Sequence, residues 1–600
     1  MKASPDSSSL STPAMPTEGS SSGRGHGDVR LKIGYGILAA VLLLILIRVV
    51  AIDRSRPQGF DEPAHVAAGM EWLQFHTYHL DPLHPPVARV AAAGLLYLSG
   101  VHFTQKTSAS LPQFWDAGNS ILYQGSYLRN LSLARIGMLP FLALLLAVTF
   151  YWTRSRFGML AAILAVVLTS TLPIILAFST LAYTDLPAAC VQFCCMLAFA
   201  EWLDRPSASS TAILGGLFGL AILTKFTSLL YIPIFAVSIV LCRFWLRKKV
   251  EHDMSTNSRW TLRALVIVLI SAAVVWGGYR FSVGPVNEFI PPNHTPSFQH
   301  FPAPVRGLAR TIVASNTNLP APAFLAGLAQ LWVMNQSAPE AYLFGKIRAG
   351  GWWYFFLVEV LLKTPIPLLM LVAIGLRPCW RHFRAGDWKS LAPALGALSI
   401  LAYTTTVRID AGLRHVLVVY PFLAIVGACG AAEIWKAVPN FHLGKIAALT
   451  LLGWQCVVAL RPGTDWISYF NEFAGKDPSR IIVSGCDLDC GQDVLRLSQE
   501  SRERNVSHIA LALWTSADLE NMQLPDFEVL EPCRPSSGWV AVSARALREG
   551  TVQHKSFPPG ALSWLSEYNP VARIGSTIWL YHIPETNQSA TPSSPCSGGS

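Results

Sequence analysis

The 600-residue chain is 52% apolar and only 14% charged, and its mean hydropathy is positive. Average soluble domains carry about a quarter charged residues, so this composition indicates a membrane protein. The net charge of +10 is dispersed over short loops, whereas nucleic-acid binders gather basic residues on one face, so we expect no nucleic-acid partner. Residues 1–30 are rich in Ser, Gly and Pro, which predicts a disordered cytoplasmic tail.

Membrane-length apolar runs begin at residue 34 and recur as far as residue 460. The run 34–52 has the roughly 20 residues that a span requires, and we interpret it as a retained span rather than a signal peptide. The sequence therefore predicts a polytopic α-helical membrane domain over 31–460, with about eleven spans. The further predicted spans lie near 131–151, 159–179, 186–203, 211–224, 227–246, 262–280, 353–376, 390–406, 415–435 and 443–460.

Basic loops predict the orientation of these spans. With the N-terminus inside, nearly all inner loops are basic, for example "RFWLRKKVEH" and "RPCWRHFRAGDWK", in keeping with the positive-inside rule. The outer segments are then the long loops 53–130 and 281–352, the turns at Asp185 and "RIDAGLR", and everything after residue 460. We expect a multi-pass protein of the cytoplasmic (inner) membrane, with its N-terminus inside and its C-terminal domain outside.

The C-terminal part has a different pattern. "RIIVSG", "HIALALW", "GWVAVSA" and "VARIGSTIWLYHI" are strand-like, and "GQDVLRLSQESRER" has helical spacing. Residues 461–583 are therefore predicted to form a small, soluble, extracytoplasmic α/β domain. Residues 584–600 are predicted to be a disordered tail.

Ionisable residues gather on the predicted outer face. Each alone can be a helix-end charge facing water, but charges near a bilayer are costly and usually functional, so the set predicts a site. Its members are Asp61, Glu62, Asp185, Lys225, Arg408, Asp410 and Arg414.

The stretch "GFDEPAHVAAG" supplies the candidate base. Pro63 favours a helix start, and helical spacing then places Asp61 and His65 on one face, with Gly69 further along and no side chain to block approach. An ionised carboxylate there, on Asp61 with Glu62 beside it, can act as a general base or hold a cation. The alternative is that Asp61 only caps the helix.

Four histidines and an aspartate follow within 25 residues. They can form a metal site, although their spacing matches no standard zinc motif. No metal ligand is assigned, and a divalent metal stays open as a cofactor. The residues are His65, His76, His79, Asp81 and His84.

Cations can serve a phosphate group. Lys225 and Arg414 at the outer boundary can bind a lipid phosphate, Arg in a bidentate manner, or can simply extend to the interface. Glu359 and Lys363 are one helical turn apart and are expected to neutralise each other, which leaves Lys363 a weaker phosphate candidate.

These motifs resemble one family. The acidic pair after the first span, the "HPP" turn at 84–86, "LAYTD" and "GLAILTKFT" are similar to the lipid-phosphate-sugar glycosyltransferases of the GT-C fold. That group includes glycosyltransferase family 39, with the protein O-mannosyltransferases and the aminoarabinose transferase of lipid A. "GWWYFFLVEVLLKTPIP" and "DAGLRHVLVVYPFLAI" resemble later spans of bacterial members, and "WISYFNEFAG" resembles the opening of their C-terminal domain. The resemblance covers most of residues 34–583.

The resemblance implies a membrane glycosyltransferase whose 31–460 domain is catalytic. It implies transfer of a sugar from a polyprenyl-phosphate donor to a hydroxyl of a protein, lipid or glycan in the cell envelope, as in protein O-linked glycosylation. Asp61 is then the base and Glu62 its catalytic neighbour. Substrate-binding residues would be His65, His84, Asp185, Lys225, Arg408 and Arg414.

One motif departs from the family pattern. "CDLDCGQD" has Asp487 and Cys490 where an Asn and a Trp are expected, and it can hold a Cys486–Cys490 pair or two thiols. This departure keeps open the alternative of a catalytically silent membrane scaffold. A second alternative is a transporter or flippase for a lipid-linked sugar, which would use the same outer charges for binding without chemistry.

Overall fold

The computed structural model describes residues 56–247, 258–290, 303–314, 316–437, 441–461, 465–552, 555–558 and 560–585, with isolated positions between 32 and 47. The predicted tail 1–30 lies outside the described residues. The same holds for most of the predicted span 34–52 and of the predicted tail 584–600.

Helices fill the chain between residues 62 and 460. Every predicted span from residue 131 onward is occupied by one helix or by two successive helices, because long apolar runs satisfy their backbone within the helix. The helices are α2 (Glu62–Gln74), α3 (Pro86–Leu98), α4 (Phe114–Leu122), α5 (Tyr127–Ile136), α6 (Leu139–Phe157), α7 (Met159–Ser170), α8 (Pro173–Ser179), α9 (Asp185–Trp202), α10 (Ala208–Thr224), α11 (Ser228–Arg247), α12 (Ser258–Gly278), α13 (Ala303–Ala314), α14 (Pro322–Gln336), α15 (Phe355–Lys363), α16 (Ile366–Arg384), α17 (Ala392–Thr404), α18 (Val419–Ala437) and α19 (Phe441–Leu460).

Five helical stretches among the described residues are long and apolar enough to cross a membrane, and up to seven if each bent pair is one span. The bent pairs are α7 with α8, at 63°, and α15 with α16, at 108°. Both bends lie next to a proline, Pro173 and Pro365, which interrupts the helical hydrogen bonds. The polytopic character is therefore evident, whereas the number of eleven spans stays a prediction.

The C-terminal region contains a five-stranded mixed sheet with the order β10-β11-β7-β5-β6. Strand β5 is parallel to β6 and β7, and β11 is antiparallel to β7 and β10. Ala541 of β7 lies between Leu511 of β5 and Leu580 of β11 in register. The strands are β5 (His508–Ala512), β6 (Asp526–Val529), β7 (Gly538–Ser543), β10 (Ala572–Ile574) and β11 (Ile578–Ile583), with helices α20 (Val494–Glu503) and α21 (Ala544–Glu549).

Three short antiparallel strand pairs also occur among the described residues. The pairs are β1 (Val283–Gly284) with β2 (Leu319–Pro320), β3 (Glu340–Leu343) with β4 (Lys346–Ala349), and β8 (Thr551–Val552) with β9 (Lys555–Ser556).

The strand predicted for "RIIVSG" is wrong. The 3₁₀ turns η7 (Pro478–Arg480) and η8 (Ser484–Cys486) lie at its two ends, and residues 482–483 between them have no regular structure. Ile482 and Val483 are fully buried without a strand partner, so their hydrophobicity serves packing rather than sheet pairing. Such a short apolar run fits either use, and sequence alone does not separate them.

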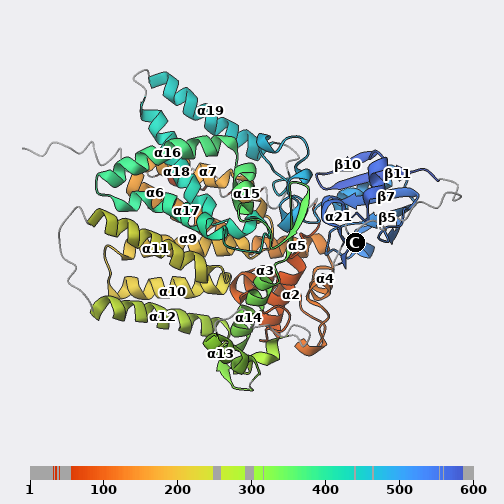
Figure 1. Cartoon of the computed structure of the whole chain (residues 1–600), viewed down its shortest axis with the longest axis horizontal. Helices are drawn as coiled ribbons and strands as arrows, with labels where there is room; N and C mark the ends of the chain where they lie inside the picture. Colours follow the sequence, from red (N-terminus) through yellow and green to blue (C-terminus); the bar gives the residue numbers. More distant parts are fainter. Residues whose placement is uncertain are drawn as a thin grey trace, which may run out of the picture.

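The two parts meet around the N-terminal helices. Figure 1 shows the long helices on one side, the blue sheet at the opposite end, and α2, α3, α4 and α5 between them. The main hydrophobic core runs through the helices, while two further clusters cover the sheet. Cys486 and Cys490, although late in the sequence, belong to the main core. The junction between the two parts therefore contains the acidic pair and the cysteine motif.

Candidate active site

Asp61 is the accessible member of the acidic pair. It precedes α2, and its Oδ2 accepts a hydrogen bond from the Arg414 guanidinium at 2.5 Å. The Asp61 side chain is 26% exposed and that of Glu62 is 0% exposed. Among the described residues the Asp61 side chain makes no capping hydrogen bond, so the capping alternative gains no support.

Glu62 is held inside the protein. Its carboxylate accepts two hydrogen bonds from Arg135, at 2.7 and 2.8 Å, and one each from the backbone N–H groups of Gly59 and Ala182. These contacts fix the start of α2 against α5 and the loop before α9. They favour a positioning role for Glu62, and direct participation in chemistry stays a prediction.

Asp185 and Lys225 form a second buried pair. Lys225 Nζ contacts Asp185 Oδ1 at 2.5 Å, with side chains 11% and 2% exposed. Lys225 ends α10 in an extended conformation, and α11 begins three residues later, so the lysine lies at a break between two apolar helices. The positive charge of Arg414 lies within electrostatic reach of both Asp61 and Asp185. Asp61, Arg414, Asp185 and Lys225 thus form one charged group.

Two of the predicted residues lie apart from this group. Arg408 is exposed. Asp410 accepts the Trp352 backbone N–H at 2.7 Å, and burial raises its pKa to about 6. Contacts and charge interactions thus join four of the seven residues, and the outer face predicted for all seven stays a prediction.

Of the four histidines in this stretch, two lie close together with Asp81 and two do not. His65, Asp81 and His84 bring one ligand atom each within 4.8 Å of one another. The Nδ1 of His65 is buried without a hydrogen-bond partner among the described residues, and His84 Nδ1 lies 2.8 Å from Asp81 Oδ2. Arg89 donates to the carbonyl oxygens of Asp81 and His84 and so holds their turn. His76 and His79, the two other histidines of this stretch, are exposed.

Gly69 does not provide an open approach, contrary to the sequence interpretation. A Cβ atom at Gly69 would lie 2.0 Å from the Arg89 carbonyl oxygen. The glycine therefore permits close packing of α2 on α3, and approach to Asp61 comes from another direction.

Charge keeps the Asp61 carboxylate ionised. Burial alone would raise its pKa, but the positive charge of Arg414 and the hydrogen bond from it outweigh burial, so the pKa lies below the ordinary value for Asp. Burial and the neighbouring His84 lower the pKa of His65 to about 3, which keeps its ring neutral at physiological pH. Asp61 is thus an available proton acceptor, and His65 is a neutral neighbour.

The charges of Glu359 and Lys363 interact, as expected, but among the described residues the two form no direct ion pair. Lys363 donates to the backbone oxygens of Ile467 and Asp487 and lies 3.9 Å from Asp487 Oδ1. The Glu359 carboxyl group is fully buried and lies within hydrogen-bonding reach of the Asp487 side chain. The spacing of one helical turn is compatible with a direct ion pair, but Lys363 contacts Asp487, which lies far along the chain, instead.

A largely apolar cavity of about 600 Å³ adjoins the charged group. Lys225, His84 and His415 contribute to its wall, together with apolar side chains such as Leu229 and Trp332. Its lining therefore combines a cation and two imidazoles with a long hydrophobic surface, which suits an amphiphile with an anionic head.

Sequence reasoning missed Tyr183. The Tyr183 hydroxyl accepts the Asp61 backbone N–H at 2.9 Å and lies 3.1 Å from Cys490 Sγ. Cys486 and Cys490 form a disulfide, one of the two alternatives that their spacing allowed. Tyr183 lies within the "LAYTD" motif, but no signal in one sequence distinguishes it from a core tyrosine.

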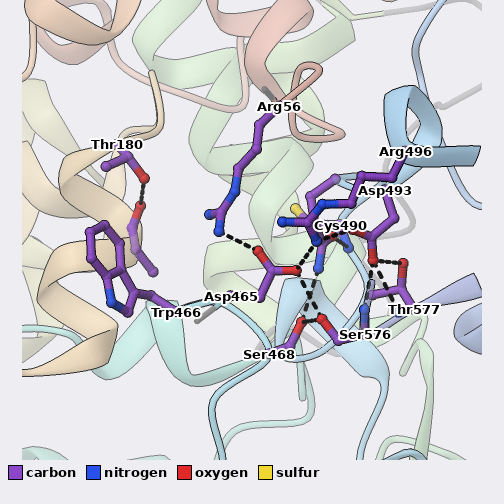
Figure 2. Close-up of polar contacts among 12 residues, drawn as sticks. Arg56, Thr180, Asp465, Trp466, Ser468, Cys490, Asp493, Arg496, Ser576 and Thr577 are labelled. Carbon is purple, nitrogen blue, oxygen red and sulfur yellow. Dashed lines mark hydrogen bonds and ion pairs between the residues drawn. The ribbon is translucent and has the colours of Figure 1, made fainter. Parts of the chain in front are cut away.

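A buried polar network lies behind the site (Figure 2). Asp465 receives Arg56 at 2.5 Å and Arg496 at 3.1 Å, and Arg496 also contacts Asp493 at 2.7 Å. The Ser576 hydroxyl donates to Asp465 at 2.9 Å. The segment leading to Asp61 is thereby tied to the region that carries the sheet.

The comparisons with known proteins agree with the motifs. The profile of the dolichyl-phosphate-mannose-protein mannosyltransferase family matches residues 127–276. No curated protein sequence matches the chain significantly.

The solved structures that the chain matches are distant in sequence, and their TM-scores are low. ArnT from Cupriavidus metallidurans in the apo state is 12% identical with a TM-score of 0.44, over 90% of this chain and 97% of that chain. The same protein bound to undecaprenyl phosphate is 13% identical with a TM-score of 0.43, over 93% and 98%. The Archaeoglobus fulgidus oligosaccharyltransferase in the apo form is 13% identical with a TM-score of 0.46, over 82% and 64%. The family match alone confirms the predicted resemblance: over residues 127–276 the chain is similar to the protein O-mannosyltransferase family of glycosyltransferases.

Proposed function

We propose that the protein is a membrane glycosyltransferase that moves a sugar from a polyprenyl-phosphate donor to an acceptor hydroxyl, with Asp61 as general base. The observation that carries the proposal is the ion pair of Asp61 with Arg414. It leaves a partly exposed, ionised carboxylate next to cations and an apolar cavity. The family match over residues 127–276 supports the same reaction class.

In the proposed reaction, the acceptor oxygen attacks the anomeric carbon of the donor sugar while its proton passes to an Asp61 carboxylate oxygen. The bond from the anomeric carbon to the phosphate oxygen breaks, and polyprenyl phosphate leaves with the bonding electrons. Lys225 and Arg414 stabilise the charge that develops on the phosphate, which in a water-poor site is usually a large contribution. Asp185 keeps Lys225 in place through their 2.5 Å contact.

The donor lipid would occupy the 600 Å³ cavity. Its isoprenoid chain would lie along Leu229 and Trp332, and its phosphate would face Lys225, His84 and His415. A cavity with a long apolar wall and few polar groups matches this division of the ligand. The acceptor is proposed more broadly, as a hydroxyl of a protein, lipid or glycan.

The site is proposed to work outside the cytoplasm. The Cys486–Cys490 disulfide adjoins it, and disulfides persist in oxidising compartments and are rare in the cytosol. This agrees with the orientation predicted from the basic loops, in which the N-terminus lies on the cytoplasmic side of the inner membrane.

A divalent ion is a further part of the proposal. His65, Asp81 and His84 would hold it, since two imidazoles and one carboxylate are a usual ligand set for catalytic zinc. The unpartnered Nδ1 of His65 fits this role. Such an ion would add positive charge beside the donor phosphate.

The test is transfer by purified protein in lipid vesicles, supplied with a panel of polyprenyl-phosphate sugars and scored by release of polyprenyl phosphate. We expect wild-type protein to consume at least one donor. Asp61→Asn should lose about 100- to 10,000-fold in rate while still binding that donor, because it removes the base and keeps the shape. Asn is also a good helix cap, so a capping role would leave the rate within a few-fold of wild type.

The two alternatives make different forecasts. A flippase would move a labelled donor across the vesicle membrane without releasing polyprenyl phosphate. A scaffold would do neither and would tolerate Asp61→Asn. Either result with the full donor panel would contradict the proposed transfer.

A further inference from the structure

We propose that the loop closed by the Cys486–Cys490 disulfide positions both members of the Asp61–Arg414 ion pair. We call residues 485–490 the cystine loop. The inference rests on the proposed function, in which Asp61 is the base. It gives a role to the motif that departs from the family pattern.

One side of the cystine loop holds the Asp61 segment. The Phe60 backbone N–H donates to the Cys490 carbonyl oxygen at 3.0 Å. The next residue, Asp61, donates its backbone N–H to the Tyr183 hydroxyl at 2.9 Å, and that hydroxyl lies 3.1 Å from Cys490 Sγ. A disulfide sulfur carries no hydrogen, so Tyr183 must be the donor in this last contact. The disulfide thus orients the Tyr183 hydroxyl, and this hydroxyl in turn holds the Asp61 backbone.

The other side holds the Arg414 segment. The Leu413 backbone N–H donates to Asp487 Oδ1 at 3.0 Å, next in the chain to Arg414. Two glycines permit the backbones to touch: a Cβ at Gly412 would lie 2.5 Å from the Gly485 carbonyl oxygen, and one at Gly485 would lie 2.1 Å from the Ala411 carbonyl. The cystine loop therefore contacts the chain neighbours of both partners, Phe60 before Asp61 and Leu413 before Arg414, although the two partners are far apart in sequence.

The disulfide is placed to hold this conformation. Cys486 has a φ of +65°, a backbone conformation that non-glycine residues rarely adopt. Cys486 and Cys490 are 5% and 0% exposed and pack in the main helical core rather than in the sheet domain. Because the closed loop is short, the cross-link restricts the unfolded chain only slightly, so its loss should affect local geometry more than global stability.

The experiment compares three full-length variants with wild type by hydrogen–deuterium exchange in detergent, without any substrate. In Cys486→Ala/Cys490→Ala we expect amides in 59–66 and in 411–416 both to exchange at least tenfold faster. Tyr183→Phe removes only the hydroxyl and should accelerate exchange in 59–66 alone. The control is Cys533→Ala, which removes another disulfide-bonded cysteine in the C-terminal region and should leave both segments unchanged.

Kinetics with a donor that wild type uses provide the second measurement. The double cysteine variant should lose at least tenfold in kcat with a donor KM within twofold of wild type. The acid limb of its pH profile should move upward, because a loosened Arg414 no longer holds Asp61 ionised. A general loss of folding would instead accelerate exchange throughout the helices.

Faster exchange confined to residues 484–492, or spread over the whole protein, would overturn the inference. So would a kcat and a pH profile equal to those of wild type. The exchange experiment needs no donor, so it tests the positioning role of the cystine loop independently of transfer. If the proposed transfer is wrong, wild type itself is inactive with every donor.

Discussion

Asp61 and Glu62 are adjacent and identical in charge, yet their surroundings favour different roles for the two carboxylates. Glu62 has its oxygens occupied by Arg135 and two backbone N–H groups, whereas Asp61 keeps one guanidinium partner and partial access to solvent. A proton acceptor needs free access, so the second carboxylate of the pair contributes rigidity to the first.

Arg414 should control the pH dependence of transfer. In wild type the rate should stay high until the pH falls below the ordinary pKa of Asp, because a base works only while deprotonated. Arg414→Gln leaves burial unopposed, so the pKa of Asp61 rises and the acid limb should move up by about 1 to 3 pH units. Arg381→Gln is the matched control, since Arg381 pairs with Glu433 and is 54% exposed. Identical pH profiles for the two variants would contradict this role.

The His65 cluster should bind a divalent ion. We expect Co²⁺ added to purified protein to give a d–d absorption band that His84→Ala abolishes. His76→Ala should keep the band, because His76 is exposed and outside the cluster. Chelation should also reduce transfer, with recovery on adding divalent ion. Wild-type protein that gives no band and loses no activity with a chelator would remove the ion from the proposal.

At the scale of elements, glycines allow the N-terminal helices to pack closely. Cβ atoms at Gly69, Gly118 and Gly137 would each lie 2.0 Å from a carbonyl oxygen of a neighbouring helix. These contacts connect α2 with α3, α4 with α2, and the end of α5 with α3. The start of α2, and Asp61 with it, therefore depends on backbone-to-backbone packing.

Gly69→Ala should destabilise the protein. The added methyl group must displace α3, and overpacking of this kind costs about 1–3 kcal/mol of unfolding free energy. Gly94→Ala in α3 is the control, because a Cβ there meets nothing within 4 Å and alanine favours the helix. Thermal unfolding in detergent should show a lower Tm for Gly69→Ala alone. Equal Tm values would show that the helices separate without cost.

The elements that the sequence predicts well are those whose pattern is local. Apolar runs located the helices from residue 131 onward, and alternation located β5 and β7. The features that the sequence did not predict depend on contacts between residues far apart in the chain. Lys363 contacts Asp487 rather than Glu359, Gly69 faces a helix rather than a ligand, and "RIIVSG" packs without a strand neighbour. Asp61, His65 and Lys225 could be named as candidates from their position, but Tyr183 could not, because its hydroxyl acts through contacts distant in sequence.

For the whole molecule, orientation is the decisive prediction. A reporter fused after residue 465 should be active only outside the cytoplasm, and one fused after residue 249 only inside, because the loop near 249 is strongly basic. A fusion at 465 that reports the cytoplasm would place Asp61 and the disulfide on the wrong side and would contradict the proposed site.

The sheet region is attached to the helices by charges as well as by apolar packing. Arg56, Asp465 and Arg496 bridge the two parts near Asp61 (Figure 2). Removing one partner of such a buried pair leaves an uncompensated charge, which is strongly destabilising. The C-terminal region thus belongs to the structural support of the site.

The apolar cavity beside Lys225 has a consequence for how the supply of an amphiphilic ligand is measured. A ligand delivered to it through the bilayer is distributed over an area, and its supply depends on its mole fraction among the lipids rather than on its molarity. Adding inert phospholipid at a constant total amount of donor would then slow the reaction, although no inhibitor is present. Adding the same volume of buffer would leave the rate per protein unchanged.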